Sequence, residues 1–146
     1  MYLVDTNVIS AGAPAKAAAR PDLVAWMEVR SDRLFLSAVT IAEIGDGIAK
    51  ASREGATRKA ADLAAWLDTV LHLYADRVLA FDTAAARIAG ILSDLARGRG
   101  WAPGFADIAI AATARCHGLT VLTRNLRHFE PMGVPALDPF ATPPPG

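Results

Sequence analysis

Four side chains whose oxygen atoms could bind a cation stand beside apolar stretches of the sequence: Asp5, Glu43, Asp107 and Asn125. Carboxylates held a few ångströms apart in a partly dry cleft raise one another's pKa, and they take up protons unless a cation neutralises them. Oxygen ligands suit Mg²⁺ or Mn²⁺, which keep several waters and need few carboxylates. We therefore expect a site for Mg²⁺ or Mn²⁺, whose chemistry would be the activation of water against a phosphate.

The elements that must position these side chains follow from the spacing of the apolar residues. Strands are predicted at 2–4, 34–36, 78–81 and 119–123. Helices are predicted at 23–30, 39–53, 57–74, 83–97 and 108–117. Gly118 suits the end of the last helix. Strands that alternate with helices indicate an α/β fold with three layers, α/β/α, around a central, mainly parallel sheet of four or five strands.

This fold would bring the four side chains to one edge of the sheet. Asp5 follows the first predicted strand, and Asn125 follows the last. Glu43 lies in the helix after the second strand, and Asp107 directly precedes the helix that leads into the last strand. Because the reactive crevice of an open parallel sheet lies beyond the carboxyl ends of its strands, we expect these side chains to converge there.

Three of the four also have an ordinary structural interpretation as a helix cap or a turn. Asp5 could cap a short helix or form an Asx turn with Asn7. Asp107 has the position of a helix N-cap, and Asn125 is an ordinary turn residue. Each of these interpretations explains one residue at a time. The sequence leaves open both the structural role and the role in cation binding.

Glu43 has alternatives of its own. It follows Thr40 by three residues, which is the spacing of a capping box, and it could also pair with Lys50 or be solvated. However, Glu43 is embedded in VTIAEIGDGIA, where its neighbours are apolar or small on nearly every side. A cap does not explain a carboxylate in such surroundings.

Composition limits the class of protein. The 146 residues suit one domain, and the apolar residues, 53% of the chain, are interrupted by charge too often for a membrane span. The N-terminus lacks the layout of a signal peptide, so we expect a cytoplasmic protein. A single cysteine, Cys116, excludes an internal disulfide and disfavours zinc. The 15 basic and 15 acidic residues cancel, so any polyanion must be held locally.

The segments VDTNVIS, SAVTIAEIGDGI and FADIAIAATARCHGLTVLTRNLRHFE, in this order, closely resemble the PIN-domain ribonucleases, in particular the VapC toxins of bacterial VapBC toxin–antitoxin pairs. The resemblance extends from Met1 to about Phe140. The triplet DTN alone is a weak signal, whereas the long C-terminal segment is specific. The resemblance implies a PIN domain at 1–140 and a Pro-rich tail at 141–146, which we expect to be frayed or extended.

The resemblance also implies roles for residues of the site. It assigns Asp5, Glu43 and Asp107 as the acidic ligands of Mg²⁺ or Mn²⁺. The fourth position, acidic in many members, is Asn125 here, which can accept through its carbonyl but adds no charge. We therefore expect one well-held cation. Further polar residues that the resemblance places at the catalytic centre, where they would orient ligands or water, are Thr6 and Thr123.

Substrate contacts are expected from residues near the same edge. The residues assigned to the substrate are Asn7, Arg124, Arg127 and Arg99, with Arg97 as a further candidate. An arginine beside the cation could hold a flanking phosphate, although each could equally be a solvated surface residue. Trp101 could stack on a base or cover an edge of the core. We expect no chemistry from His117 or His128.

The function that the resemblance implies is that of a toxin. It would be a metal-dependent endoribonuclease that cleaves tRNA or another structured RNA, such as rRNA. Its partners would be a cognate VapB-type antitoxin and a second copy of the chain, as a homodimer or within a toxin–antitoxin hetero-oligomer. No membrane partner is expected.

Two alternatives from other classes remain. A catalytically weak RNA-binding module of the same fold would fit Asn125. A magnesium-dependent small-molecule phosphatase would also use carboxylates at strand ends. It ranks below the others, because an aspartyl-phosphate mechanism wants a second Asp two residues after Asp5, where this chain has Asn7.

Overall fold

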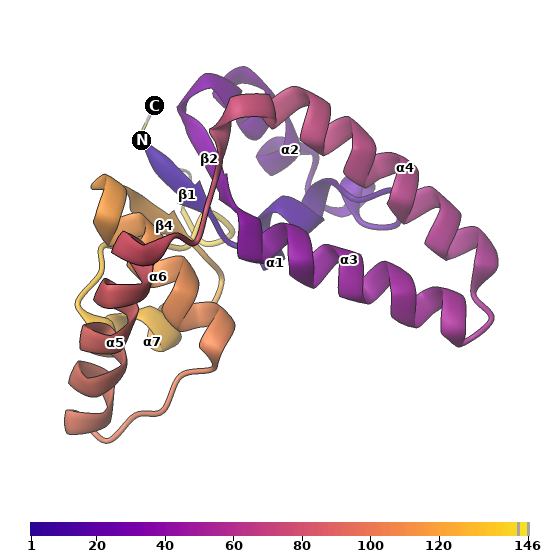
Figure 1. The fold of residues 1–146 in the computed structure, drawn as a ribbon. Helices are drawn as coiled ribbons and strands as arrows, with labels where there is room; N and C mark the ends of the chain where they lie inside the picture. Colours follow the sequence, from indigo (N-terminus) through magenta and orange to yellow (C-terminus); the bar gives the residue numbers. More distant parts are fainter. Residues whose placement is uncertain (143, 146) are drawn as a thin grey trace.

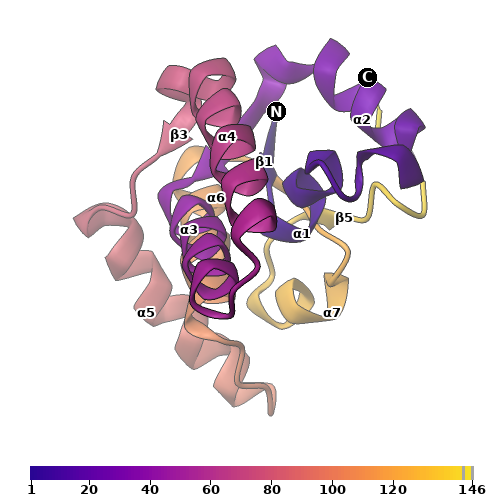
Figure 2. The same cartoon turned by 90° about the vertical axis from the view of Figure 1, so that its right-hand side faces the viewer.

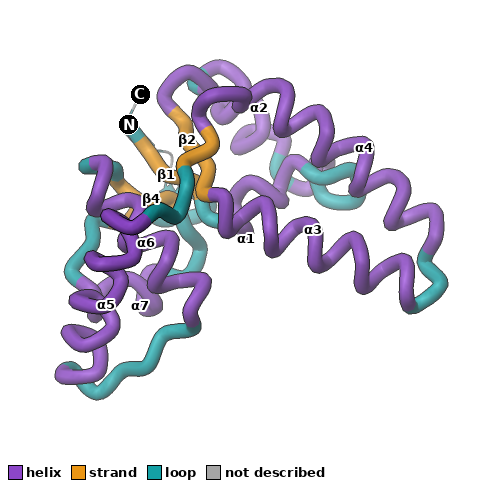
Figure 3. Tube along the Cα trace, viewed as in Figure 1, coloured by secondary structure: helices purple, strands orange, loops and turns teal. Residues whose placement is uncertain are grey.

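The computed structural model describes residues 1–142 and 144–145. Its centre is a parallel sheet with the order β3-β2-β1-β4-β5 (Figure 1). The strands are β1 (Tyr2–Val4), β2 (Leu34–Ser37), β3 (Val78–Leu79), β4 (Thr120–Leu122) and β5 (Ala136–Leu137). The predicted mainly parallel sheet is confirmed, and its strands are short beside the helices that cover them (Figure 3).

The helices pack on both faces of this sheet. They are α1 (Thr6–Ile9), α2 (Pro21–Val29), α3 (Ala38–Arg53), α4 (Thr57–Tyr74), α5 (Thr83–Gly98), α6 (Phe105–His117) and α7 (Leu126–Phe129). Short 3-10 turns connect them: η1 (Ser10–Gly12), η2 (Ala17–Ala19), η3 (Ser31–Arg33), η4 (Ala75–Arg77) and η5 (Glu130–Met132). Helices α3 and α4 run side by side as an arm that projects from the sheet (Figures 1 and 2).

Side-chain alternation along the strands creates two cores, one on each face. Leu3 and Val121 point into a core with α5, α6 and α7. Their neighbours Val4 and Leu122 point into the other core, with α1, α2, α3 and α4. Successive residues of a strand face opposite sides of the sheet, so alternate apolar residues pack against the helices on each face. This packing gives the three layers that the sequence predicts.

Two features differ from the prediction: the start of α6 and the presence of β5. Helix α6 begins at Phe105, three residues before the predicted start, so Asp107 lies in its first turn. Strand β5 is absent from the predicted strands because two residues carry no recognisable alternation. Gly118 ends α6 as predicted, with a positive φ of 66°.

The C-terminal tail packs back on the sheet. The hydroxyl of Tyr2 donates to the Pro145 carbonyl at 2.9 Å, and Pro144 is buried. The described part of the tail is therefore docked rather than frayed, while Pro143 and Gly146 of the predicted tail lie outside the described residues. Across the described residues, no helix combines the length and the apolar character needed to cross a bilayer.

Candidate active site

The carboxyl ends of the three central strands gather the predicted site residues. Strand β1 lies between β2 and β4, so residues that follow these strands meet at one edge. Asp5 follows β1 and Thr123 follows β4, and the Asp5 backbone N–H donates to the Leu122 carbonyl at 2.9 Å. Glu43 lies on α3, which starts directly after β2.

Asp5 is 4% exposed, and both oxygens of its carboxylate accept hydrogen bonds. Its Oδ1 accepts from the Thr6 backbone N–H at 2.8 Å, which caps α1. Its Oδ2 accepts from Thr123 Oγ1 at 2.8 Å and from Asn7 Nδ2 at 3.3 Å. The cap predicted as the ordinary interpretation of Asp5 is thus present, but it occupies one of the two oxygens, and the other connects two strand ends.

Glu43 is held by the residue that follows Asp5. Thr6 Oγ1 donates to Glu43 Oε1 at 2.6 Å and lies 3.2 Å from the buried Thr40 hydroxyl. The capping-box interpretation of Glu43 is wrong, because α3 begins at Ala38 and Ser37 is its N-cap. Thr6 therefore connects the carboxylate of α3 to the backbone that carries Asp5.

Asp107 is held by a residue that the sequence reasoning set aside. His128 Nδ1 lies 3.0 Å from Asp107 Oδ2, and the two side chains are 31% and 25% exposed. The N-cap interpretation of Asp107 is wrong, because Gly104 precedes the helix and Asp107 is its third residue. The one signal that could have indicated His128 is its spacing: it follows Asn125 by three residues, one helical turn.

The three carboxylates share one electrostatic environment. Burial raises the pKa of Asp5, and hydrogen bonds from Thr123 and the Thr6 backbone lower it in part. The negative charges of Asp107 and Glu43 raise the Asp5 pKa further, which places both near enough to act on it. No Lys or Arg of the described residues forms an ion pair with any of the three. The site is a cluster of acidic side chains whose one basic contact among the described residues is that of His128 with Asp107.

The donors fit a hydrated hard cation rather than a closed protein cage. Among residues 1–142 and 144–145, no three His, Cys, Asp or Glu side chains converge closely enough to form a ready-made metal cluster. The carboxylates are hard oxygen donors, and Mg²⁺ in such sites keeps much of its water shell. Burial raises the pKa of Asp5, and the neighbouring acidic charges raise it further, so a cation among these carboxylates is favourable.

The remaining predicted residues divide into two groups. Asn125 and Arg124 join the cluster through their backbones: Asn125 N–H donates to Thr123 Oγ1 at 3.0 Å, and Arg124 N–H donates to Asn7 Oδ1 at 3.1 Å. Arg127 is exposed on α7. Arg99 instead donates to the Pro131 carbonyl at 3.0 Å, which engages it away from the cluster.

The two remaining candidates, Arg97 and Trp101, have partners of their own. Arg97 lies 3.5 Å from Asp94, three residues earlier on α5. Trp101 is 39% exposed, and its ring centroid lies 6.0 Å from that of His128. Trp101 therefore lies beside the residue that holds Asp107.

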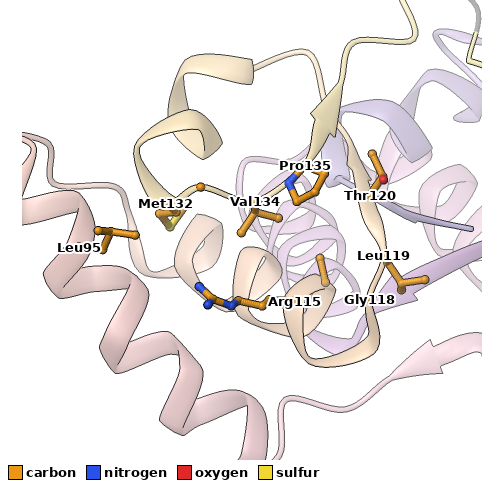
Figure 4. A pocket seen from close by; sticks show the side chains of 10 residues that line it. Leu95, Arg115, Gly118, Leu119, Thr120, Met132, Val134 and Pro135 are labelled. Carbon is orange, nitrogen blue, oxygen red and sulfur yellow. The ribbon is translucent and has the colours of Figure 1, made fainter.

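A cavity of about 480 Å³ lies at the opposite edge of the sheet, where β4 begins (Figure 4). Leu95, Leu119, Met132 and Val134 give it mainly apolar walls, and Arg115 is the charged residue in its lining. No carboxylate lines it. The acidic cluster at the carboxyl ends is therefore the better candidate for chemistry.

Comparison with known proteins identifies relatives over nearly the whole chain. The model of the PIN domain family matches residues 2–133. VapC ribonuclease Y4jK of Sinorhizobium fredii is 36% identical, covering 96% of this chain and 98% of the relative. Toxin FitB of Neisseria gonorrhoeae is 33% identical, covering 96% of this chain and 99% of the relative.

A solved structure is similar over the same range. The crystal structure of FitAcB from Neisseria gonorrhoeae superposes with a TM-score of 0.83 at 35% identity, and the match covers 96% of this chain and 99% of that chain. The predicted resemblance to PIN-domain proteins is thus confirmed at the level of family and fold.

Proposed function

Because this chain belongs to the PIN-domain family, we propose that it is the toxin of a toxin–antitoxin pair and acts as an endoribonuclease that uses Mg²⁺ or Mn²⁺. The observation that carries the proposal is the acidic cluster at the strand ends, where Thr123 holds the buried Asp5 and Thr6 holds Glu43. Burial raises the pKa of Asp5, and the nearby charges of Asp107 and Glu43 raise it further. The relatives named as a VapC ribonuclease and as a toxin support the same activity.

Each acidic side chain would hold the cation with a position set by a neighbour. Thr123 fixes the rotamer of Asp5, Thr6 fixes Glu43, and His128 fixes Asp107. A cation bound there supplies Lewis-acid activation of water and of the phosphate. Asn125 adds no fourth charge, which supports one tightly held cation rather than two.

The reaction would be hydrolysis of an RNA phosphodiester by water. In-line attack on phosphorus breaks the bond to the 3′ oxygen, so the products are a 5′-phosphate and a 3′-hydroxyl. The chain's own contribution is to orient the carboxylates before substrate binds, which lowers the cost of assembling the reacting groups. Arg124 and Arg127 at the exposed rim would contact flanking phosphates of tRNA or rRNA.

The partner would be a cognate antitoxin of the VapB type. A groove of about 420 Å³ between α2 and α4 has a mainly apolar lining that includes Met27, Trp66, Val70 and Leu73. Leu73 is 59% exposed, so the groove opens to solvent. A helix with an apolar face would bury these side chains, as amphipathic partner segments do in other grooves.

A second copy of the chain would cover another apolar surface. Ile91 on α5 is 64% exposed and Phe105 at the start of α6 is 67% exposed. The Phe105 ring packs edge-on against Phe81 at 5.7 Å between centroids. Large apolar side chains exposed on the adjacent helices α5 and α6 favour an interface, and we assign it to a homodimer that is retained in the toxin–antitoxin hetero-oligomer.

The decisive experiment combines growth and cleavage. Wild type and Asp5→Asn are expressed in a bacterium with and without a gene for the proposed VapB-type antitoxin, and the purified proteins are incubated with bulk tRNA in Mn²⁺ or EDTA. We expect arrest and cleavage by wild type alone, relief by the antitoxin gene, and no cleavage in EDTA. If wild type and Asp5→Asn are equally harmless and neither cleaves RNA in Mn²⁺, the proposal is wrong.

A binding module is the second candidate, and Asn125 favours it. In that case wild type and Asp5→Asn would bind labelled tRNA equally and leave it intact. A phosphatase is disfavoured further by the structure, because Asn7 is engaged on both sides, by Asp5 Oδ2 and by the Arg124 backbone N–H.

A further inference from the structure

Arg124 is a cation beside the acidic cluster, and it has no carboxylate partner among the described residues. It follows Thr123, whose hydroxyl binds Asp5, and its backbone N–H is held by Asn7. Its side chain is exposed, yet its guanidinium carbon lies 3.8 Å from the centroid of the Phe140 ring. An exposed arginine ordinarily samples many rotamers, so this stacking calls for a reason.

The C-terminal segment is built to hold Phe140 at that place. Strand β5 pairs with β4, and Thr123 N–H donates to the Leu137 carbonyl at 2.9 Å. Directly afterwards Asp138 Oδ1 accepts from Phe140 N–H at 2.9 Å, which makes an Asx turn. The turn therefore starts at the end of β5, next to the end of β4 from which Thr123 holds Asp5.

A second arginine, Arg20, which is the N-cap residue of α2, also holds Phe140. Arg20 Nη1 donates to the Phe140 carbonyl at 3.2 Å, and its guanidinium carbon lies 5.3 Å from the ring centroid. Two further nitrogens of Arg20 bind Asp22, both at 3.2 Å. The guanidinium N–H groups of Arg20 are thus used in hydrogen bonds within the protein. Arg124 instead contacts the Phe140 ring, and its guanidinium N–H groups remain available to a ligand.

We propose that Phe140 is a positioning residue. It holds Arg124 in the orientation that binds an RNA phosphate next to the phosphate at which the strand is cleaved. Face stacking on an aromatic ring leaves the edge of a guanidinium free, and that planar edge matches two phosphate oxygens. Ordering the side chain in advance removes part of the entropy cost of binding. The inference rests on the proposed function, because it names how that site holds its polyanion.

The test measures binding of fluorescein-labelled bulk tRNA in Mg²⁺ by anisotropy, with Asp5→Asn as the parent so that RNA stays intact. Arg124→Gln removes the charge, and we expect about a tenfold weaker Kd and a shallower salt dependence by about one phosphate contact. Phe140→Leu removes the ring and keeps apolar bulk, with an expected loss of about 2- to 5-fold. Phe140→Tyr keeps the ring and should bind as the parent does.

A double-mutant cycle separates positioning from general damage. If Phe140 acts through Arg124, Phe140→Leu does not weaken RNA binding further in the Arg124→Gln background. Equal losses in both backgrounds, or no loss in either, would overturn the inference. Should Phe140→Leu fail to fold, Arg124→Lys decides: it keeps the charge without the planar face, so binding as tight as the parent's would overturn it.

These outcomes are distinct from those of the proposed function. Cleavage of bulk tRNA by wild type in Mn²⁺ reports on the endoribonuclease, whatever Phe140 does. RNA binding by the Asp5→Asn parent, and its loss in the Arg124 and Phe140 variants, report on the positioning of Arg124 by Phe140, whether or not RNA is cut.

Discussion

His128 Nδ1 lies 3.0 Å from Asp107 Oδ2, and this contact joins α7 to the first turn of α6. The ring donates when Nδ1 carries the proton, so one carboxylate oxygen of Asp107 is occupied and its rotamer is set. Partners of this kind behind a ligand carboxylate orient it toward a cation.

Replacement of His128 should therefore weaken cation binding. We expect His128→Ala to lower Mn²⁺ affinity and RNA cleavage by about tenfold, the low end for loss of such a partner. His128→Gln keeps a donor and should retain part of the affinity. Isothermal titration with Mn²⁺ measures the effect, and unchanged affinity in His128→Ala would show that Asp107 needs no support.

Burial of Asp5 predicts a pH-dependent stability. Its folded pKa is raised above the ordinary 3.8, chiefly by burial, so ionisation costs folding free energy. The wild type therefore loses stability as pH rises from about 4 through the raised folded pKa. Asp5→Asn removes this loss and should unfold at higher denaturant concentration at pH 7, with the gain disappearing below pH about 4.

The measurement is urea unfolding in EDTA across this pH range, which excludes stabilisation by bound cation. Asp46→Asn, on the exposed surface of α3, controls for the removal of one negative charge. A stability difference between wild type and Asp5→Asn that is constant with pH would contradict the assignment of burial as the cause.

Thr6 should matter for activity more than for stability. Thr6→Val removes the hydroxyl 2.6 Å from Glu43 and leaves that exposed carboxylate free to turn. We expect about a tenfold fall in kcat/KM, because the Glu43 carboxylate would no longer be held in position. The free energy of unfolding should fall by only about 1 kcal/mol. Thr6→Ser retains the hydroxyl and should keep most activity. Steady-state cleavage and urea unfolding of both variants test this, and equal activity of Val and Ser would refute it.

Two glycines should respond in opposite directions to alanine. Gly118 ends α6 with φ of 66°, where a Cβ is strained, so Gly118→Ala should lower the free energy of unfolding by about 1 kcal/mol. Gly90 lies inside α5 with nothing within 4 Å of an added Cβ. Gly90→Ala should therefore raise stability by about 0.5–1 kcal/mol. Urea unfolding of both decides, and a shift of the same sign would contradict the argument.

Much of this architecture could be predicted because it depends on local patterns. The short apolar runs and the helical spacing indicate the layers, and the helix predicted at 57–74 matches α4 at both ends. Asp5 and Thr123 follow apolar strands in the sequence, and the parallel sheet brings their chain positions to one edge. Such features follow from residues near one another in the chain.

The contacts between side chains could not be predicted in this way. His128 and Asp107 are 21 residues apart, and Arg124 meets Phe140 only because the two-residue β5 returns the chain to β4. The sequence by itself determined the layers, the parallel sheet and the family to which the chain belongs. Only the tertiary structure decided which neighbour holds each carboxylate, because a hydrogen bond or a stacked ring depends on distances between segments that no local periodicity records.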